Sequence, residues 1–265
     1  MNHRVTTAWP QGAAAWPLAA RAQQPTMPVI GFLNAGSAEA LAPEAAAFRN
    51  GLGQAGYVEG QNVTVEYHWL EGQYERMPAL IADLVRRRVA VIASGFTHGA
   101  LAAKAATTTI PIVFAVADDP VKLGLVAIFA RPGGNATGIN FFSSELVTKR
   151  LGLLHDLVPK AVRVAVLVNP ANATATEATL RDIPEAARAL GLQIQVLNAS
   201  TSREIEVAFA TLVRDRADAL FVGPDGFFVS RGVQFATLAT RYGIPAIYSN
   251  RDYTAAGGAD ELWDR

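Results

Sequence analysis

Cysteine is absent from this chain of 265 residues, and histidine occurs only four times. Without thiols the chain cannot form disulfide bridges, thiolate zinc sites or a cysteine nucleophile. The four histidines are scattered, and no pair has the spacing of metal ligands: His3, His68, His98 and His155. The sequence therefore predicts neither a metal site nor a thiol-based active site, and it leaves the cellular compartment undecided.

Charge of one sign and long hydrophobic runs are also missing. Lys plus Arg and Asp plus Glu each number 23, so the chain has no electrostatic footprint for DNA or RNA. No stretch of about 18 apolar residues is free of charges or prolines, so no segment is expected to span a membrane. We therefore expect no nucleic-acid partner and no membrane span.

Motifs of nucleotide-dependent enzymes and hydrolases are absent as well. The first predicted strand is followed by Asn34 to Glu39, which lacks the Gly-x-Gly-x-x-Gly pattern of dinucleotide binding. The chain contains neither a Walker-type Gly-Lys-Ser/Thr nor a Gly-x-Ser-x-Gly nucleophile elbow. We therefore expect a protein that uses no cofactor and catalyses no reaction.

What the chain does contain is an alternation of apolar strands and amphipathic helices from Pro28 onward. In the first half, strands are predicted at 29–33, 63–67, 89–93 and 112–116, with helices at 43–55, 74–88 and 98–107. In the second half, strands are predicted at 163–168, 192–197, 219–222 and 246–248, with helices at 174–190, 203–216 and 232–242. Such an order is typical of α/β folds with parallel sheets covered on both faces.

The two halves also resemble each other in detail. Residues 79–92 resemble 208–221, and residues 105–114 resemble 238–248, at an offset of about 130 positions. An Ile-Pro pair precedes a strand at the same step of both halves. We interpret this pattern as a duplication that produces two α/β lobes. The carboxyl ends of their strands would line one cleft, and hinge closure would bury a ligand there.

These patterns also suggest domain boundaries. We expect lobe 1 at residues 28–139 and lobe 2 at residues 140–250, with residues 131–138 leading into a hinge crossover. Residues 1–27 are interpreted as a degenerate export segment, because Ala20-Arg21-Ala22 fits the pattern before a signal-peptidase cut. The alternative for this segment is an Ala-rich tail. Residues 251–265 are expected to hold the hinge return and an aberrant C-terminus.

Polar and glycine-rich residues follow each predicted strand, where the cleft would lie. The candidates for ligand contact in lobe 1 are Asn34, Ser37, Ser94, Phe96, Thr97, Asp118 and Asp119. The candidates in lobe 2 are Asn169, Asp225, Phe227 and Tyr248. The aromatic members either belong to the core or stack on a planar ligand.

Two kinds of polar contact are expected among these candidates. Ser94 and Thr97 precede a helix, where they either cap its N-terminus or help its free N–H groups to hold a ligand carboxylate; these roles are compatible. Asp118, Asp119 and Asp225 either cap helices or accept a charge-assisted hydrogen bond from a ligand ammonium group. The sequence therefore favours a ligand that carries both charges.

Several motifs resemble one known family, the ABC transporter substrate-binding proteins of the tryptophan/tyrosine transport type. The segments that carry the resemblance are Pro28-Val-Ile-Gly-Phe-Leu-Asn, Ala55-Gly-Tyr-Val-Glu-Gly-Gln-Asn-Val, Asp119-Pro-Val-Lys-Leu-Gly-Leu-Val, Arg131-Pro-Gly-Gly-Asn-Ala-Thr-Gly and Ala165-Val-Leu-Val-Asn-Pro. The resemblance runs from about Ala13 to Gly258.

The resemblance implies a type I periplasmic-binding-protein fold with two Rossmann-like lobes and a periplasmic location. It implies a small solute such as an amino acid, with aromatic amino acids prominent among the family's ligands, and an ABC permease in the inner membrane as partner. The family's ligand sites map onto Ser37, the region of Phe96 and Thr97, Asp118, Asn169, Asp225 and Tyr248.

The chain departs from the family pattern at both ends. Only residues 13–22 of an apolar export signal are recognisable, so the signal is interpreted as degenerate. The family continues past Gly258 as Gly-Leu-Met-Ser-Tyr-Gly-Thr, whereas this chain ends Gly258-Ala-Asp-Glu-Leu-Trp-Asp-Arg265. We interpret the ending as a one-base frameshift, and we expect a truncated chain without the last elements of lobe 1.

The sequence thus predicts an extracytoplasmic solute-binding protein of an ABC importer, which closes its lobes around an amino acid or a similar small solute. One alternative is a ligand-sensing module of the same fold; as a repressor, it would need a helix-turn-helix before Pro28, where the sequence is Ala-rich. The other is a doubly wound α/β enzyme, which would need a phosphate loop. Fold alone does not choose between these functions.

Overall fold

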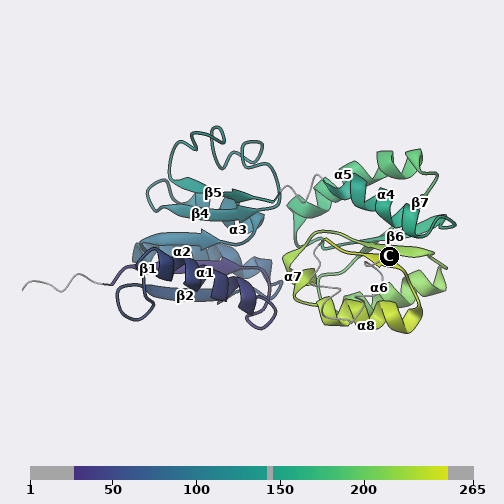
Figure 1. Cartoon of the computed structure of the whole chain (residues 1–265), viewed down its shortest axis with the longest axis horizontal. Coiled ribbons are helices and arrows are strands. Elements are labelled where there is room, and N and C mark those ends of the chain that lie inside the picture. Colours follow the sequence, from purple (N-terminus) through teal and green to yellow (C-terminus); the bar gives the residue numbers. More distant parts are fainter. Residues whose placement is uncertain (1–26, 142–145, 250–265) are drawn as a thin grey trace, which may run out of the picture.

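The computed structural model describes residues 27–141 and 146–249, which form two α/β lobes lying side by side (Figure 1). The strands of lobe 1 are β1 (Val29–Asn34), β2 (Thr64–Trp69), β3 (Val91–Ser94), β4 (Ile112–Val116) and β5 (Ala136–Asn140). Its helices are α1 (Ala42–Gln54), the 3-10 helix η1 (Tyr74–Arg76), α2 (Met77–Arg87) and α3 (Thr97–Ala106).

Lobe 2 repeats this alternation. Its strands are β6 (Arg163–Val168), β7 (Gln193–Asn198), β8 (Ala219–Val222) and β9 (Ala246–Ile247). Its helices are α4 (Val147–Leu157), α5 (Ala173–Ala189), α6 (Ser202–Arg214), α7 (Gly226–Val229) and α8 (Gly232–Tyr242). The predicted α/β class is confirmed.

Both sheets are parallel, and the first four strands of lobe 1 have the same order as the four strands of lobe 2. The strand order is β2-β1-β3-β4-β5 in lobe 1 and β7-β6-β8-β9 in lobe 2, so the first strand of each lobe lies between the second and the third. In such a doubly wound sheet the strand order reverses beside the first strand. Ligands bind there, outside the carboxyl ends of the strands. The topology therefore places the polar strand ends of each lobe along one edge.

Backbone hydrogen bonds confirm that the lobes are equivalent position by position. Gly95 N donates to Leu33 O over 3.0 Å, and in lobe 2 Gly223 N donates to Leu167 O over 2.9 Å. The two Ile-Pro pairs also match, because Pro111 O accepts from the third strand of lobe 1 over 2.9 Å and Pro245 O accepts from that of lobe 2 over 2.8 Å. The structure thus agrees with a duplication.

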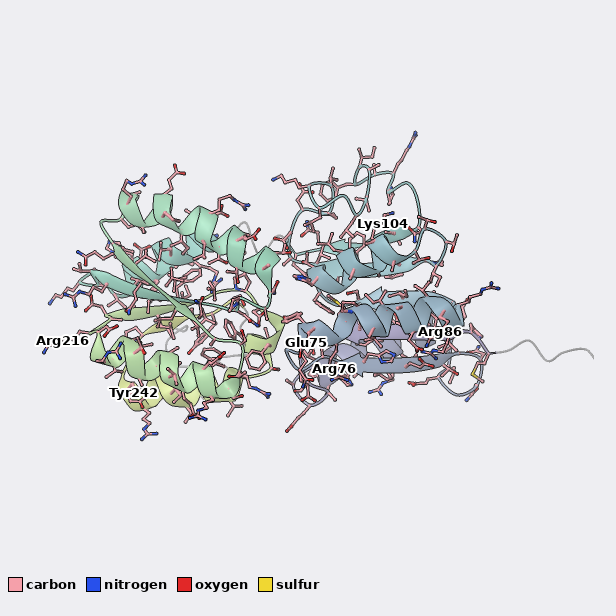
Figure 2. All side chains as sticks on the ribbon, turned by 180° about the vertical axis from the view of Figure 1, so that it is seen from behind. Glu75, Arg76, Arg86, Lys104, Arg216 and Tyr242 are labelled. Atoms are coloured by element: carbon pink, nitrogen blue, oxygen red, sulfur yellow. The ribbon has the colours of Figure 1, made fainter. Side chains whose placement is uncertain are left out.

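Helices cover the two lobes unequally. In lobe 1, α1 packs on one face of the sheet through Phe48 and Leu52, while α2 and α3 cover the other face. Figure 1 shows α1 in front of the sheet, and Figure 2 shows α2 and α3, which carry Arg86 and Lys104, from behind. In lobe 2, α4 and α5 pack on one face and α6 and α8 on the other.

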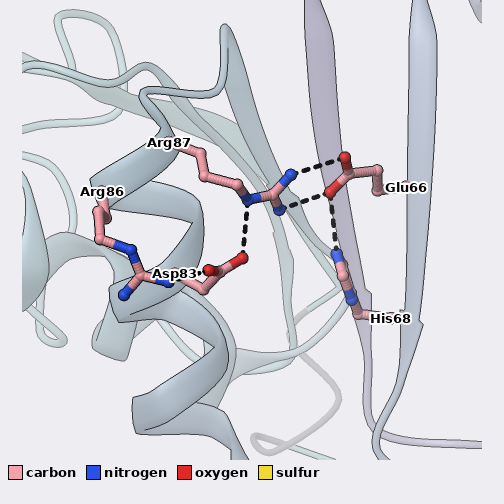
Figure 3. A network of polar contacts seen from close by, with 5 residues as sticks. All are labelled: Glu66, His68, Asp83, Arg86 and Arg87. Carbon is pink, nitrogen blue, oxygen red and sulfur yellow. Dashed lines mark hydrogen bonds and ion pairs between the residues drawn. The ribbon is translucent and has the colours of Figure 1, made fainter.

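A polar network ties the outer strand of lobe 1 to helix α2 (Figure 3). Arg87 donates from Nη1 and Nη2 to both carboxylate oxygens of Glu66, over 2.8 and 2.6 Å, and from Nε to Asp83 over 2.7 Å. Asp83 also pairs with Arg86, and His68 Nε2 lies 3.6 Å from Glu66 Oε2. Arg87 lowers the pKa of Glu66, whereas burial lowers the pKa of His68.

Three elements were missing from the sequence prediction, and one of them is the short helix α7 that follows Asp225. Residues 136–140 form strand β5, which pairs with β4, whereas the sequence analysis placed most of them in a turn and crossover. This edge strand is mostly exposed and contains one glycine, so it lacks an apolar run. Helix α4 was also missed, although Val147, Leu151 and Leu154 repeat at helical spacing and are buried.

Helix α4 is fixed to lobe 2 by a buried arginine. Arg150 is 7% exposed, lies with its guanidinium carbon 4.3 Å from the ring centroid of Phe221, and donates to Val222 O over 2.7 Å. Because Val222 ends strand β8, this contact anchors α4 at the strand ends. The interpretation of residues 1–27 as an export segment falls, except for Met27, outside the described residues, as does that of 251–265 as a hinge return and aberrant C-terminus.

Candidate ligand site between the lobes

The carboxyl ends of the strands meet where the two lobes touch. Helix α7 follows strand β8 on the side of lobe 2 that faces lobe 1 (Figure 1). A Cβ on Gly226 would lie 2.7 Å from the Cβ of Ala35, and one on Gly72 would lie 2.8 Å from the ring of Phe227. These two glycines therefore allow the lobes to approach closely at this edge.

Asp225 is the centre of the contact. It lies between β8 and α7, is 7% exposed, and its Oδ1 caps α7 by accepting from Phe228 N over 3.1 Å. Oδ1 also accepts from Asn169 Nδ2 over 3.1 Å, and Oδ2 accepts from Asn172 Nδ2 over 2.9 Å. Two side-chain amides at the end of β6 thus hold a buried carboxylate. A carboxylate in this setting is suited to binding a cationic group.

A tyrosine from lobe 1 supplies the remaining contact to this carboxylate. The hydroxyl of Tyr74 donates to Asp225 Oδ2 over 2.9 Å. Tyr74 is 6% exposed, and burial, followed by the charge of Asp225, raises its pKa far above the usual value. The hydroxyl therefore stays protonated and acts as a donor.

A second contact between the lobes lies beside the first. His98 Nδ1 is 3.3 Å from Asn172 Oδ1, and the His98 ring centroid is 5.8 Å from that of Tyr74. The ring of Phe96 lies 6.2 Å from Tyr74 on the same lobe. The contact surface thus combines three rings from lobe 1 with an amide and a carboxylate from lobe 2.

Lobe 1 presents the N-terminus of helix α3 at this edge. The helix begins at Thr97, and its N-cap residue Phe96 provides no side-chain cap. Thr97 Oγ1 donates to Asp118 Oδ2 over 3.0 Å, while Ser94 Oγ donates to the backbone oxygen of Phe96 over 2.9 Å. Asp118 is thus paired within lobe 1, whereas Asp225 lies at the contact between the lobes, where a ligand that bridges them would reach it.

The other predicted site residues are divided between this edge and local roles. Asn34 is 8% exposed at the end of β1, next to Gly95. Ser37 Oγ accepts from Ala40 N over 3.3 Å, and Asp119 Oδ1 accepts from Val121 N over 2.8 Å, so both stabilise turns. Tyr248 packs against Phe235 of the lobe 2 core, and burial raises its pKa to about 12. The structure therefore brings Asn169 and Asp225 into direct contact and leaves Ser37, Asp119 and Tyr248 with local contacts.

Three residues of this edge were missing from the predicted site: Tyr74, His98 and Asn172. Asn172 follows Asn169 by three residues in the polar segment after a predicted strand, so its position in the sequence could have marked it as a site candidate. Tyr74 was assigned to a helix, and His98 was interpreted as a surface residue at the start of a helix rather than as a site residue. Only the packing of one lobe on the other shows that these two side chains reach lobe 2.

Little space remains around Asp225 in this arrangement of the lobes. A recess of about 150 Å³ is too narrow for a water-sized sphere; it is lined by residues that include Val168, Thr176, Thr179, Gly223 and Asp225. Any ligand at this edge would therefore require the lobes to separate first. Among the described residues, no His, Asp and Glu side chains cluster in a way that would hold a metal ion. No helix within residues 27–141 and 146–249 is long and apolar enough to cross a bilayer.

Comparison with known proteins gives one consistent picture. A "Tyrosine-binding protein" of Clostridioides difficile (strain R20291) is 28% identical over 210 residues, which are 79% of this chain and 60% of that protein. This chain thus spans about three fifths of the length of that relative.

Solved structures share the fold. A conserved domain protein from Vibrio cholerae has a TM-score of 0.74 and 25% identity, with 87% of this chain and 77% of that chain covered. An ABC domain from Streptococcus pneumonia in complex with L-Trp has a TM-score of 0.66 and 19% identity, with 89% and 84% covered. The predicted type I periplasmic-binding-protein fold is confirmed.

The family described as "ABC transporter substrate binding protein" matches residues 29–260. This is a family of binding proteins rather than enzymes, as the sequence analysis predicted. The chain belongs to the ABC transporter substrate-binding protein family.

Proposed function

We propose that this chain is the extracytoplasmic solute-binding subunit of an ABC importer, and that it holds an α-amino acid between its lobes. The observation that carries the proposal is Asp225, a buried carboxylate at the strand ends of lobe 2 that faces lobe 1. Its partners are two amides, a backbone N–H and a phenol, all of which are neutral. A primary ammonium group would supply the missing positive charge.

The opposite charge of the ligand finds a partner on lobe 1. Helix α3 begins at Thr97 without a side-chain cap, so its first-turn N–H groups are suited to a carboxylate. The two charged groups of an α-amino acid would then bridge the lobes. Lobes near residues 28–139 and 140–250 would close on it as two bodies and present the closed form to a permease.

Aromatic side chains support an aromatic amino acid as ligand. Tyr74, Phe96 and Phe227 all lie at the edge where the lobes meet. Rings at such positions stack on planar groups. The curated relative at 28% identity is named a tyrosine-binding protein, which agrees with this choice. L-Tyrosine is therefore the first probe, with L-tryptophan and L-leucine beside it.

Binding of matched analogues tests the proposal. In isothermal titration, L-tyrosine is expected to bind, whereas an analogue without the amino group and one without the carboxylate bind far more weakly. Asp225→Asn removes the charge that the ammonium needs and should weaken binding by about 2 kcal/mol or more, roughly 30-fold.

A matched variant separates this effect from a general one. Asp182 pairs with Arg181 on the surface of lobe 2, so Asp182→Asn should leave the affinity unchanged. Thermal melts of both variants check that they fold. Equal affinity for L-tyrosine and for its analogue without the amino group would contradict the role of Asp225.

A further inference from the structure

We propose that Tyr74 is an internal competitor of the ligand: its hydroxyl occupies the position on Asp225 that the ligand's ammonium group takes, and it closes the lobes in the ligand's place. This inference rests on the proposed function and adds a residue that sets affinity and selectivity. Its basis is the 2.9 Å contact between Tyr74 of lobe 1 and Asp225 of lobe 2.

The coordination of Asp225 leaves one position for an exchangeable partner. A carboxylate accepts about four hydrogen bonds, two at each oxygen. Oδ1 accepts from Asn169 and Phe228, and Oδ2 accepts from Asn172 and Tyr74. The first three donors belong to lobe 2 and stay in place when the lobes separate. Only the contribution of Tyr74 is lost, so only that position opens to a ligand.

The surroundings of Tyr74 hold it ready for this contact. Its ring packs among Phe96 and His98 of lobe 1, with ring centroids 6.2 and 5.8 Å away. Burial keeps its pKa high, so the hydroxyl donates at every physiological pH. His98 lies 3.3 Å from Asn172 and adds a second contact across the same edge. Closure of the lobes thus brings a fixed donor onto a fixed acceptor.

Competition of this kind has two consequences. The apparent dissociation constant equals the intrinsic one divided by the fraction of molecules that Tyr74 does not hold closed, so it rises as that fraction falls. A charged donor forms a stronger hydrogen bond to a carboxylate than a neutral phenol does. Ligands with a primary ammonium group therefore displace Tyr74, whereas neutral ligands of similar shape do not. The bond acts as a selectivity filter for cationic amines.

Tyr74→Phe in the full chain tests the inference, because it removes the hydroxyl and keeps the ring. Small-angle scattering of extensively dialysed protein should show a larger radius of gyration for the variant than for the wild type. Titration with L-tyrosine should show about tenfold tighter binding, since the competing bond is gone.

Tyr67→Phe is the matched control. Tyr67 also lies in lobe 1 and its hydroxyl also contacts a carboxylate, that of Glu59 over 3.2 Å, but within the same lobe and at the surface. This variant should change neither the radius of gyration nor the affinity. A thermal melt confirms that both variants are folded.

The outcomes separate this inference from the proposed function. Weaker binding of L-tyrosine by Tyr74→Phe would mean that the hydroxyl binds the ligand, and the inference would be wrong. An unchanged radius of gyration would also overturn it. If wild-type protein binds no amino acid, the proposed function fails, yet the scattering experiment still decides whether Tyr74 holds the lobes closed.

Discussion

The two lobes carry different chemistry at equivalent positions. Gly95-Phe96-Thr97 of lobe 1 and Gly223-Pro224-Asp225 of lobe 2 occupy the same step, because Gly95 N and Gly223 N donate to equivalent leucine carbonyls. Lobe 1 continues there into the uncapped N-terminus of α3, whereas lobe 2 places a buried carboxylate before α7. In the proposed function, the duplicated scaffold would provide one end for an anion and one for a cation. A site with this polarity fits a zwitterion better than a neutral solute.

The lobes differ equally in how well their sheets are covered. Val113 in β4 and Ile247 in β9 are equivalent, since each follows an Ile-Pro pair by two residues. Val113 is 43% exposed, but Ile247 is only 2% exposed. Among the described residues, α1 alone packs on that face of lobe 1, whereas α4 and α5 both pack on the face of lobe 2 that holds Ile247. Lobe 2 therefore gains more stability from this face.

Truncation at these two positions gives the largest expected difference. Ile247→Ala should lower the free energy of unfolding by about 3 kcal/mol, because it leaves a cavity in a closed core. Val113→Ala should cost less than about 1 kcal/mol, because solvent already reaches the side chain. Urea denaturation of both variants measures the difference. Equal losses would show that the exposed face of lobe 1 is covered in solution.

The outer strands provide a second comparison with a smaller expected effect. Glu66 in β2 and Gln195 in β7 are equivalent, since they pair with Gly31 and Ala165. Glu66 forms a bidentate ion pair with Arg87, whereas Gln195 donates to Asp215 over 2.7 Å. Glu66→Gln gives lobe 1 the residue of lobe 2. It should cost about 0.5–1 kcal/mol in low salt, and less in high salt because ions screen the exposed pair.

Chemical denaturation at two salt concentrations measures this effect, and the charge-preserving variant Glu66→Asp serves as its control. A loss of stability that is the same in both salts would mean that the ion pair contributes nothing beyond its packing.

The two α/β lobes could be predicted from the sequence, but the asymmetry between them could not, and the reasons for success and failure are physical. Continuous apolar strands such as 163–168 indicate a sheet that is covered on both faces, so local patterns predicted the α/β lobes. The same patterns placed Asp225 and Asn169 at strand ends, and therefore at one edge of the sheet. Strand β5 was not predicted, because an exposed edge strand carries no apolar run. The contact of Tyr74 with Asp225 was not predicted, because it depends on the distance between the lobes, which no local sequence pattern encodes.

The smallest expected effect is a pH dependence confined to lobe 1. Burial lowers the pKa of His68 below its ordinary value, so the unfolded chain takes up a proton at a higher pH than the folded one. Stability from this residue is therefore complete above the ordinary pKa of about 6.5 and is lost as pH falls through the lower folded value.

His68→Gln removes the titration, and Gln195→Ala at the outer strand of lobe 2 leaves it in place. Between pH 7.5 and 5, wild type should lose up to about 2 °C more in melting temperature than His68→Gln. Identical pH profiles for these two proteins would mean that His68 is solvated well enough to take up its proton without cost. The ion pair of Glu66 with Arg87 would then remain the main electrostatic difference between the outer strands.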